Sequence, residues 1–329
     1  MESFLKRVRA AILLAAACTY VQSGIAQQVP SAYPTKPVKI VIPLGPGNSL
    51  EIATRLVADK LTTALGQPFV IEAQPGAAGQ IGTERVARSP ADGYTLLSAT
   101  DGVIAILPNL QKHVPFDPVA DFSPIAQMIG IPFVLIVHPS VQAKTTEELV
   151  RVAKARPGKL EFSSGGTGSA QQLAMELFMN LTATNLLHVP YKGAPQAAMD
   201  VVSGHIPVAF AGVPIVASLI KQGRLRALGI ASDKRLPLLR DTRTLVEQGI
   251  PLRFATWGGL FAPAGTSHEI IRRLNQETRV ALTSADVRAR MTEFGFEIYG
   301  SSSEQFSNVV KADLAKMAGL IRQAGIKPQ

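Results

Sequence analysis

The chain has 329 residues, of which 47% are hydrophobic and 17% charged, and its formal net charge is +9. This composition allows a large buried core, and the length is typical of roughly two domains. The basic residues are scattered and aromatic residues make up only 6%, which argues against nucleic-acid binding. The single cysteine, Cys18, lies near the N-terminus, so disulfide and thiol chemistry are excluded for the rest of the chain.

The first 26 residues have the pattern of an export signal. A basic start is followed by a short apolar run at residues 10–17 and by small residues up to Ala26. The apolar run is too short to span a bilayer. We expect a signal peptide at residues 1–26, cleavage after Ala26 and a soluble periplasmic protein. A lipoprotein anchored at Cys18 is the alternative, and it is disfavoured because Ala15 replaces the leucine of that pattern.

The next hundred residues alternate short apolar runs with glycine-rich turns. The pattern predicts strands at residues 38–42, 69–72 and 94–98, and a helix at residues 49–64 whose start is capped by Asn48 and Glu51. Repeated strand–helix units predict a parallel sheet. In such sheets ligands collect beyond the carboxyl ends of the strands, where the turns of this segment lie.

A second series of the same kind follows residue 131. Apolar crossings near residues 131–139 and 252–262 join the two series and predict two lobes. Further strands are expected at residues 160–163, 186–189, 206–210, 225–231 and 254–262, and helices at 145–155, 195–203, 215–221, 267–282, 285–294 and 304–323.

The stretch 162–169 reads Phe-Ser-Ser-Gly-Gly-Thr-Gly-Ser and leads from a strand into a helix with an apolar stripe at Leu173, Leu177 and Leu181. Ser169 and Gln172 form a capping box that leaves several amides and the positive helix end facing the loop, which attracts an anion. The loop matches neither a Walker loop nor a dinucleotide fingerprint. Hydroxyls and amides without a cation suit a small carboxylate, although a glycine-rich connector without ligand remains the alternative.

Catalytic and metal-binding patterns are not found in the sequence. Ser169 does not stand in the G-x-S-x-G order of a nucleophile elbow, and neither Asp101 nor Asp200 has an evident acid–base partner. The histidines lie far apart and contain no H-E-x-x-H motif. We therefore expect no catalytic residue, no metal and no cofactor. The five histidines are His113, His138, His188, His205 and His268.

Several stretches taken together resemble the tripartite tricarboxylate transporter receptor family, the Bordetella-uptake-gene type of extracytoplasmic solute-binding proteins. The resemblance runs from about Tyr33 to the C-terminus, and its motifs occur in the family's order. These motifs are Tyr-Pro-x-Lys-Pro at 33–37, Pro-Gly at 46–47, Gln-Pro-Gly-Ala-Ala-Gly-Gln-Ile-Gly at 74–82, Asp-Gly-Tyr-Thr-Leu-Leu at 92–97, Ser-Gly-Gly-Thr-Gly-Ser at 164–169, His-Val-Pro-Tyr-Lys-Gly at 188–193 and Trp-Gly-Gly-Leu-Phe-Ala-Pro-Ala-Gly-Thr at 257–266.

The resemblance implies an α/β, periplasmic-binding-protein-like fold of type II, in which two βα lobes close on a small carboxylate. Lobe 1 would comprise residues 33–135 and 257–329, and lobe 2 residues 136–256. A monomer that delivers its ligand to a membrane permease of a tripartite tricarboxylate transporter is implied, with no reaction catalysed. The ligand-binding residues carried over by position are Gly47, Asn48, Ala78, Thr100, Ser164, Thr167, Gly168 and Ser169.

Lobe 1 departs from the family's pattern at three positions. Asn48, Glu51 and Ala78 stand where glycine, aspartate and glycine are usual. The added side-chain bulk leaves the ligand open among aliphatic dicarboxylates, aromatic carboxylates, amino acids and amides. Two other readings compete with a binding protein. One is a secreted α/β enzyme acting on a small carboxylate, and the other is the effector part of a transcription regulator, which would need a DNA-binding module.

Overall fold

The computed structural model describes residues 33–323 of the chain. The sheet and helices belong to the unit that begins at Lys36. The expected signal peptide at residues 1–26, with Ala26 and Cys18, lies outside the described residues.

The described strands form one mixed sheet in the order β2-β1-β3-β9-β4-β7-β5-β6, with β8 and β10 also paired to β4. β1 pairs in parallel with β2 and β3, and β5 pairs in parallel with β6 and β7. The bounds are β1 Val38–Ile42, β2 Phe69–Ala73, β3 Thr95–Thr100, β4 Phe122–Val137, β5 Glu161–Ser164, β6 Leu187–Pro190, β7 Val208–Gly212, β8 Arg226–Ile230, β9 Ala255–Pro263 and β10 Glu297–Ile298.

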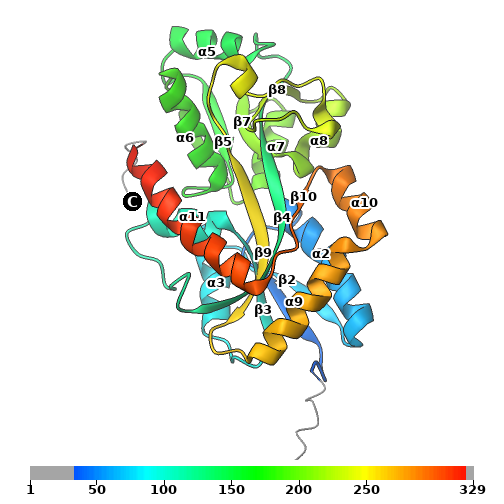
Figure 1. Ribbon diagram of the computed structural model, residues 1–329. Helices are drawn as coiled ribbons and strands as arrows, with labels where there is room; N and C mark the ends of the chain where they lie inside the picture. The colour runs from blue at the N-terminus through cyan, green and yellow to red at the C-terminus, as the bar shows by residue number, and fades with distance from the viewer. Residues whose placement is uncertain (1–32, 324–329) are drawn as a thin grey trace, which may run out of the picture. The chain divides into compact units, whose positions relative to one another are not determined.

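β4 and β9 join the two parts of the sheet. The first part of β4 pairs antiparallel with β9, from Phe122 opposite Pro263 to Pro132 opposite Ala255, with two shifts of register. From Phe133 onward β4 pairs instead with β7 and β8. Figure 1 shows β4 and β9 side by side between the group α5 to α8 and the group α2, α3 and α9. One strand therefore belongs to both halves of the sheet.

The helices flank these two parts of the sheet (Figure 1). No described helix is long and apolar enough to cross a membrane. The helical bounds are α2 Ser49–Leu65, η1 Ala77–Gly79, α3 Gln80–Ala87, η2 Gly102–Ile106, α4 Leu107–Leu110, α5 Thr146–Ala155, α6 Ala170–Thr182, α7 Ala194–Val202, α8 Val213–Lys221, η3 Pro237–Leu239, η4 Val246–Gln248, α9 His268–Thr283, α10 Ala285–Phe294 and α11 Ser303–Gln323.

Each part of the sheet packs its own apolar core. One core centres on the end of β4 with α7 and α8, and includes Val134, Val201 and Val216. The other combines β1, β3, β9 and α11, where the rings of Phe261 and Phe306 lie 4.8 Å apart. Two cores joined through shared strands are the arrangement expected of two lobes.

Three expectations from the sequence were wrong in detail. The sheet is mixed, because the crossing strands run antiparallel to their neighbours. β4 begins at Phe122, well before the crossing predicted near residues 131–139, because Pro124 and two shifts of register interrupt the alternation of apolar residues. The stripe on α6 was also misplaced: Leu181 is 48% exposed, whereas Phe178 is fully buried.

Thr278 in α9 provides a test of packing energetics. Its side chain is buried, and Oγ1 has no hydrogen-bond partner within residues 33–323. A buried hydroxyl without a partner costs about 1–3 kcal/mol. Thr278→Val keeps the shape and removes that penalty, so we expect the free energy of unfolding in urea to rise by about 1 kcal/mol.

Thr283→Val is the matched control, because Thr283 is exposed on the same helix and its hydroxyl donates to the carbonyl of Arg279. It should change stability by less than about 0.5 kcal/mol. A Thr278→Val protein less stable than wild type would mean that the hydroxyl is satisfied in solution.

Candidate ligand cavity

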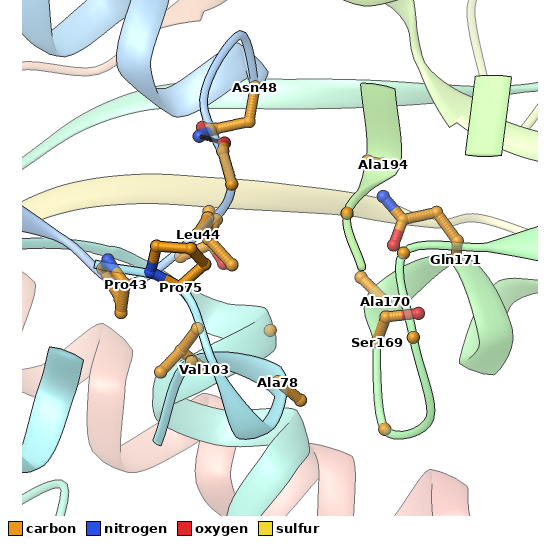
Figure 2. A pocket seen from close by; sticks show the side chains of 18 of the residues that line it. Pro43, Leu44, Asn48, Pro75, Ala78, Val103, Ser169, Ala170, Gln171 and Ala194 are labelled. Atoms are coloured by element: carbon orange, nitrogen blue, oxygen red, sulfur yellow. Dashed lines mark hydrogen bonds between the residues drawn. The ribbon is translucent and has the colours of Figure 1, made fainter. Parts of the chain in front are cut away.

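A cavity of about 710 Å³ lies at the carboxyl ends of β1, β2 and β3 on one side and of β5 and β6 on the other. Figure 2 shows Pro43, Leu44, Pro75, Ala78 and Val103 on one side, facing Ser169, Ala170 and Gln171 on the other. Among the described lining residues, the formally charged side chain is that of Lys192. Other lining residues are Gly45, Asn48, Ser49, Leu50, Gly76, Ala77, Gln80, Thr100, Gly102, Gln111, Ile131, Phe133, Gly165, Thr167, Gly168, Tyr191, Gly193, Ala194, Gly212, Ile215 and Thr256.

The two sides approach to van der Waals distance at the rim. A Cβ on Gly45 would lie 3.5 Å from the carbonyl oxygen of Lys192, and a Cβ on Gly102 would lie 3.8 Å from the Cβ of Ala170. The β1–α2 loop therefore meets the β6–α7 turn, and the start of η2 meets the start of α6. The cavity is bounded by backbone from both series of strands.

The capping side chains of the β1–α2 loop bond to the backbone of the loop. Asn48 caps α2 by accepting from the N–H of Glu51 at 3.0 Å, and its amide nitrogen donates to the carbonyl of Gly45 at 2.6 Å. The Glu51 carboxylate accepts from the N–H of Gly47 at 2.7 Å and from Arg55 at 2.8 Å. The capping side chains are thus used within the loop, but the backbone N–H groups of Ser49 and Leu50 at the start of α2 have no hydrogen-bond partner within residues 33–323, and both residues line the cavity.

The segment after β2 holds two alanines in the left-handed region. Ala77 and Ala78 have φ values of 45° and 55°, a conformation that costs an L-residue roughly 1–2 kcal/mol. Both residues line the cavity. Strain of this kind is common at binding sites, where the surrounding structure holds the backbone in place.

The β5–α6 loop also leaves backbone donors unpaired. Gly168 donates to Gln172 Oε1 at 2.8 Å, Ser169 caps α6 by accepting from the N–H of Gln172 at 3.4 Å, and the N–H of Ser169 donates to Gly166. Within residues 33–323 the backbone N–H groups of Thr167, Ala170 and Gln171 have no hydrogen-bond partner. These groups and the positive end of the α6 dipole lie at the cavity and favour an anion.

Ser164 supports this loop from behind. Its side chain is fully buried, and its hydroxyl contacts His188 Nε2 at 2.6 Å and the N–H of Gly166 at 3.2 Å. The ring of His188 stacks on Phe162 at 4.9 Å. Burial lowers the pKa of His188, so the imidazole is neutral at pH 7. The serine–histidine pair faces away from the cavity lining and fixes the loop.

Asp101 lies between two cavity-lining residues, Thr100 and Gly102, and is buried. Its carboxyl accepts from the N–H groups of Gly102 at 2.9 Å and Trp257 at 3.3 Å. Burial raises the pKa of Asp101 well above its usual value, and the charge of Asp313 raises it further. The two N–H groups and Lys316 act in the opposite direction. The carboxyl links β3 to β9 below the cavity.

Six of the eight residues expected from the sequence line the cavity: Asn48, Ala78, Thr100, Thr167, Gly168 and Ser169. Gly47 and Ser164 are not among the lining residues. The N–H of Gly47 is donated to Glu51, and Ser164 lies behind its loop. The sequence reasoning did not nominate Ser49, Gln171 or Thr256, which lie next to nominated residues or motifs. No group of three or more potential metal ligands occurs in the described part of the chain.

A family model described as tripartite tricarboxylate transporter family receptor matches residues 53–326. The chain therefore belongs to this family, whose members and structural neighbours are solute-binding receptors and not enzymes. These neighbours are periplasmic solute-binding proteins with a two-lobe fold, which confirms the expected fold class.

The individual relatives are similar over nearly their whole length. Protein BugT of Bordetella pertussis is 33% identical over 93% of this chain and 94% of its own. R. palustris Rpa4515, solved with adipate, is 32% identical with a TM-score of 0.88, covering 90% of this chain and 100% of that one. MatC (Rpa3494) from Rhodopseudomonas palustris, solved with bound malate, is 26% identical with a TM-score of 0.84, covering 88% of this chain and 100% of that one.

The Asn48 side chain both caps α2 and bonds to Gly45, so its removal should lower the stability of the protein. Asn48→Ala removes the helix cap and the bond to Gly45, so we expect the free energy of unfolding to fall by about 1–2 kcal/mol in urea titrations. Asn48→Ser is the matched control, because serine is an equally good cap and should retain most of that stability. If Asn48→Ala unfolds at the same urea concentration as wild type, the cap contributes nothing.

The raised pKa of Asp101 predicts a pH dependence of stability. The folded state holds this proton more tightly than the unfolded chain, so stability falls as pH rises from about 4 toward the folded-state pKa. Asp101→Asn keeps an oxygen that accepts from Gly102 and Trp257 but carries no charge. We expect its stability relative to wild type to increase with pH between about 4 and 8.

Asp286→Asn is the control for this pH series. The salt bridge to Lys60 lowers the pKa of Asp286, so its charged form is the one favoured in the folded state. Loss of that charge should not make the protein relatively more stable as pH rises. Parallel pH profiles for wild type and Asp101→Asn would contradict a raised pKa at Asp101.

Proposed function

We propose that this protein captures a small carboxylate between its two lobes and delivers it to a membrane permease of a tripartite tricarboxylate transporter. Membership of the receptor family supports the transport role. The neighbours solved with adipate and with malate support a carboxylate as the ligand. The cavity of about 710 Å³ is large enough for an acid of that size.

The single observation that carries the proposal is the set of unpaired donors at the start of α6. The backbone N–H groups of Ala170 and Gln171 belong to the first turn of α6, that of Thr167 belongs to the loop before it, and all three residues line the cavity. A carboxylate seated there accepts charge-assisted hydrogen bonds from them and from the Thr167 and Ser169 hydroxyls.

The other nominated residues have supporting roles in this proposal. Asn48, Ala78 and Gly168 form walls of the cavity, and Thr100 lines its floor. Gly47 is held by the Glu51 carboxylate and keeps the β1–α2 loop in place, while Ser164 and His188 fix the β5–α6 loop.

The proposal includes the organisation and destination of the chain. We assign residues 33–135 and 257–329 to lobe 1 and residues 136–256 to lobe 2, with crossings in β4 and β9. The change of β4 pairing partner at Phe133 supports this division. The N-terminal sequence pattern supports export to the periplasm with removal of residues 1–26. We expect the exported protein to act as a monomer that meets the permease.

Thr167→Val tests the carboxylate site. It removes one hydroxyl at similar volume, and a hydrogen bond to a charged group contributes about 1.5–3 kcal/mol. We expect calorimetry with adipate, malate, succinate and benzoate to show binding of at least one acid, weakened roughly ten-fold to a hundred-fold in the variant. The melting temperature without ligand should stay unchanged.

Two further variants separate binding from folding. Ser169→Ala removes the α6 cap, so it should lose affinity and also about 1 kcal/mol of stability. Thr63→Val, exposed on α2 and remote from the lining, should alter neither. Unchanged affinity in both loop variants would mean that the glycine-rich loop is only a connector and that the carboxylate binds elsewhere.

A further inference from the structure

Three hydroxyls that line the cavity, here called the floor hydroxyls, take no part in the proposed carboxylate site. Ser49, Thr100 and Thr256 line the cavity and are only 6%, 8% and 5% exposed. Within residues 33–323 none of their hydroxyls makes a hydrogen bond, whereas nearby Thr54 and Ser98 pair with each other at 2.8 Å. Buried polar side chains without partners are uncommon, and each calls for an explanation.

These hydroxyls open onto the cavity rather than into the packed interior. Among the described residues, the side-chain polar atom that is both fully enclosed and without a partner is Thr278 Oγ1. The three floor hydroxyls also lack partners, so their oxygen atoms must retain some accessible surface. A Cβ added to Gly102 would lie 3.1 Å from Thr100 Oγ1, and a Cβ added to Gly212 would lie 3.2 Å from Ser49 Oγ. Both glycines line the cavity and leave the space before these hydroxyls empty of side chain.

Strand register brings two of the hydroxyls onto one face. Thr100 in β3 pairs with Gly258 in β9, and Thr256 lies two residues before Gly258. Paired residues share a face, as do residues two apart on a strand, so Thr100 and Thr256 are diagonal neighbours with Cβ atoms typically about 7–8 Å apart. Leu50 covers this face, because its Cδ1 lies 2.5 Å from where a Cβ of Gly258 would lie. Ser49 directly precedes Leu50.

The side chains around the hydroxyls are apolar, and the backbone N–H groups of Ser49 and Leu50 at the start of α2 add donors. Leu50, Val103, Ile131 and Phe133 line the same region, and the charged side chain of the lining, Lys192, belongs to the β6–α7 turn. A carboxylate in this region would be desolvated without a cation. A hydroxyl both donates and accepts, so a neutral group with the same capability satisfies three such hydroxyls better than an anion that only accepts.

We propose that Ser49, Thr100 and Thr256 form a subsite for an uncharged hydrogen-bonding group of the ligand, a hydroxyl or a primary amide, separate from its carboxylate. The inference rests on the proposed function, because the carboxylate is assigned to the start of α6. It narrows the ligand class to hydroxy acids and acid monoamides, and disfavours dicarboxylates.

The test uses two matched series of probes in calorimetry with the purified protein. The four-carbon series is butanoate, 4-hydroxybutanoate, succinamate and succinate. The six-carbon series is hexanoate, 6-hydroxyhexanoate, adipamate and adipate. We expect the hydroxy acid or the monoamide of at least one series to bind about ten-fold tighter than both the parent acid and the diacid, since one polar pairing is worth about that factor.

Three variants test whether the floor hydroxyls cause the preference for an uncharged end group. Ser49→Ala, Thr100→Val and Thr256→Val should each reduce the preference about ten-fold and leave the affinity for the parent acid within about two-fold. Their melting temperatures without ligand should not fall, because the replaced hydroxyls have no partner to lose. Thr63→Val is the control that should leave all affinities unchanged.

The outcomes separate this inference from the proposed function. Tightest binding by the diacid in both series, or a preference that survives all three floor variants, overturns the inference while leaving the carboxylate site intact. Loss of acid binding in Thr167→Val but no end-group preference in wild type also overturns it. Failure of every probe to bind overturns both proposals.

Discussion

The antiparallel pairing of β4 with β9 is the constraint on which the rest of the structure depends. Both halves of the sheet are joined through these strands, and β4 changes partner from β9 to β7 and β8 at Phe133. The cavity lies at this change, because Ile131, Phe133 and Thr256 all line it. Paired strands fix these side chains by register, so the cavity floor is rigid, and the loops that follow the parallel strands complete its walls.

The two walls use their capping side chains in the same way. On the β1–α2 side, Asn48 and Glu51 bond to the backbone of their own loop, and the N–H groups of Ser49 and Leu50 stay unpaired. On the β5–α6 side, Gln172 and Ser169 satisfy two positions and leave the N–H groups of Thr167, Ala170 and Gln171 unpaired. Two capping boxes of similar sequence therefore leave unpaired N–H groups at the start of both α2 and α6, and the β5–α6 loop adds that of Thr167.

Local features of the site could be predicted from the sequence, and non-local ones could not. The caps at Asn48 and Ser169 follow from residues three positions apart, and both are present. The pairing of Ser164 with His188 depends on the parallel register of β5 and β6, which no local pattern specifies. The position of Thr256 beside Ile131 likewise follows from the antiparallel crossing, which was predicted too short at its N-terminal end.

The burial of Asp101 could not be predicted from the sequence either, because it depends on how β3, β9 and α11 pack together. Its chain neighbours are small or polar, which is typical of an exposed loop, and the sequence suggested no partner for it. The structure places Asp101 against the N–H of Trp257 from β9, with the charge of Asp313 from α11 raising its pKa. Desolvation of a carboxyl depends on what packs around it from distant parts of the chain.

Ala77 and Ala78 show how backbone conformation shapes the cavity wall beside β2. Both occupy the left-handed region, which glycine would enter at lower cost. The backbone is held there from its C-terminal side, where a Cβ on Gly82 would lie 2.7 Å from the carbonyl oxygen of Gln74 and 3.0 Å from Pro43. α3 therefore packs closely against this loop, and each alanine directs its methyl group according to that backbone. The wall beside β2 is therefore shaped by a strained turn, while the hydroxyls of Ser49, Thr100 and Thr256 and the N–H groups at α6 are polar groups of the lining.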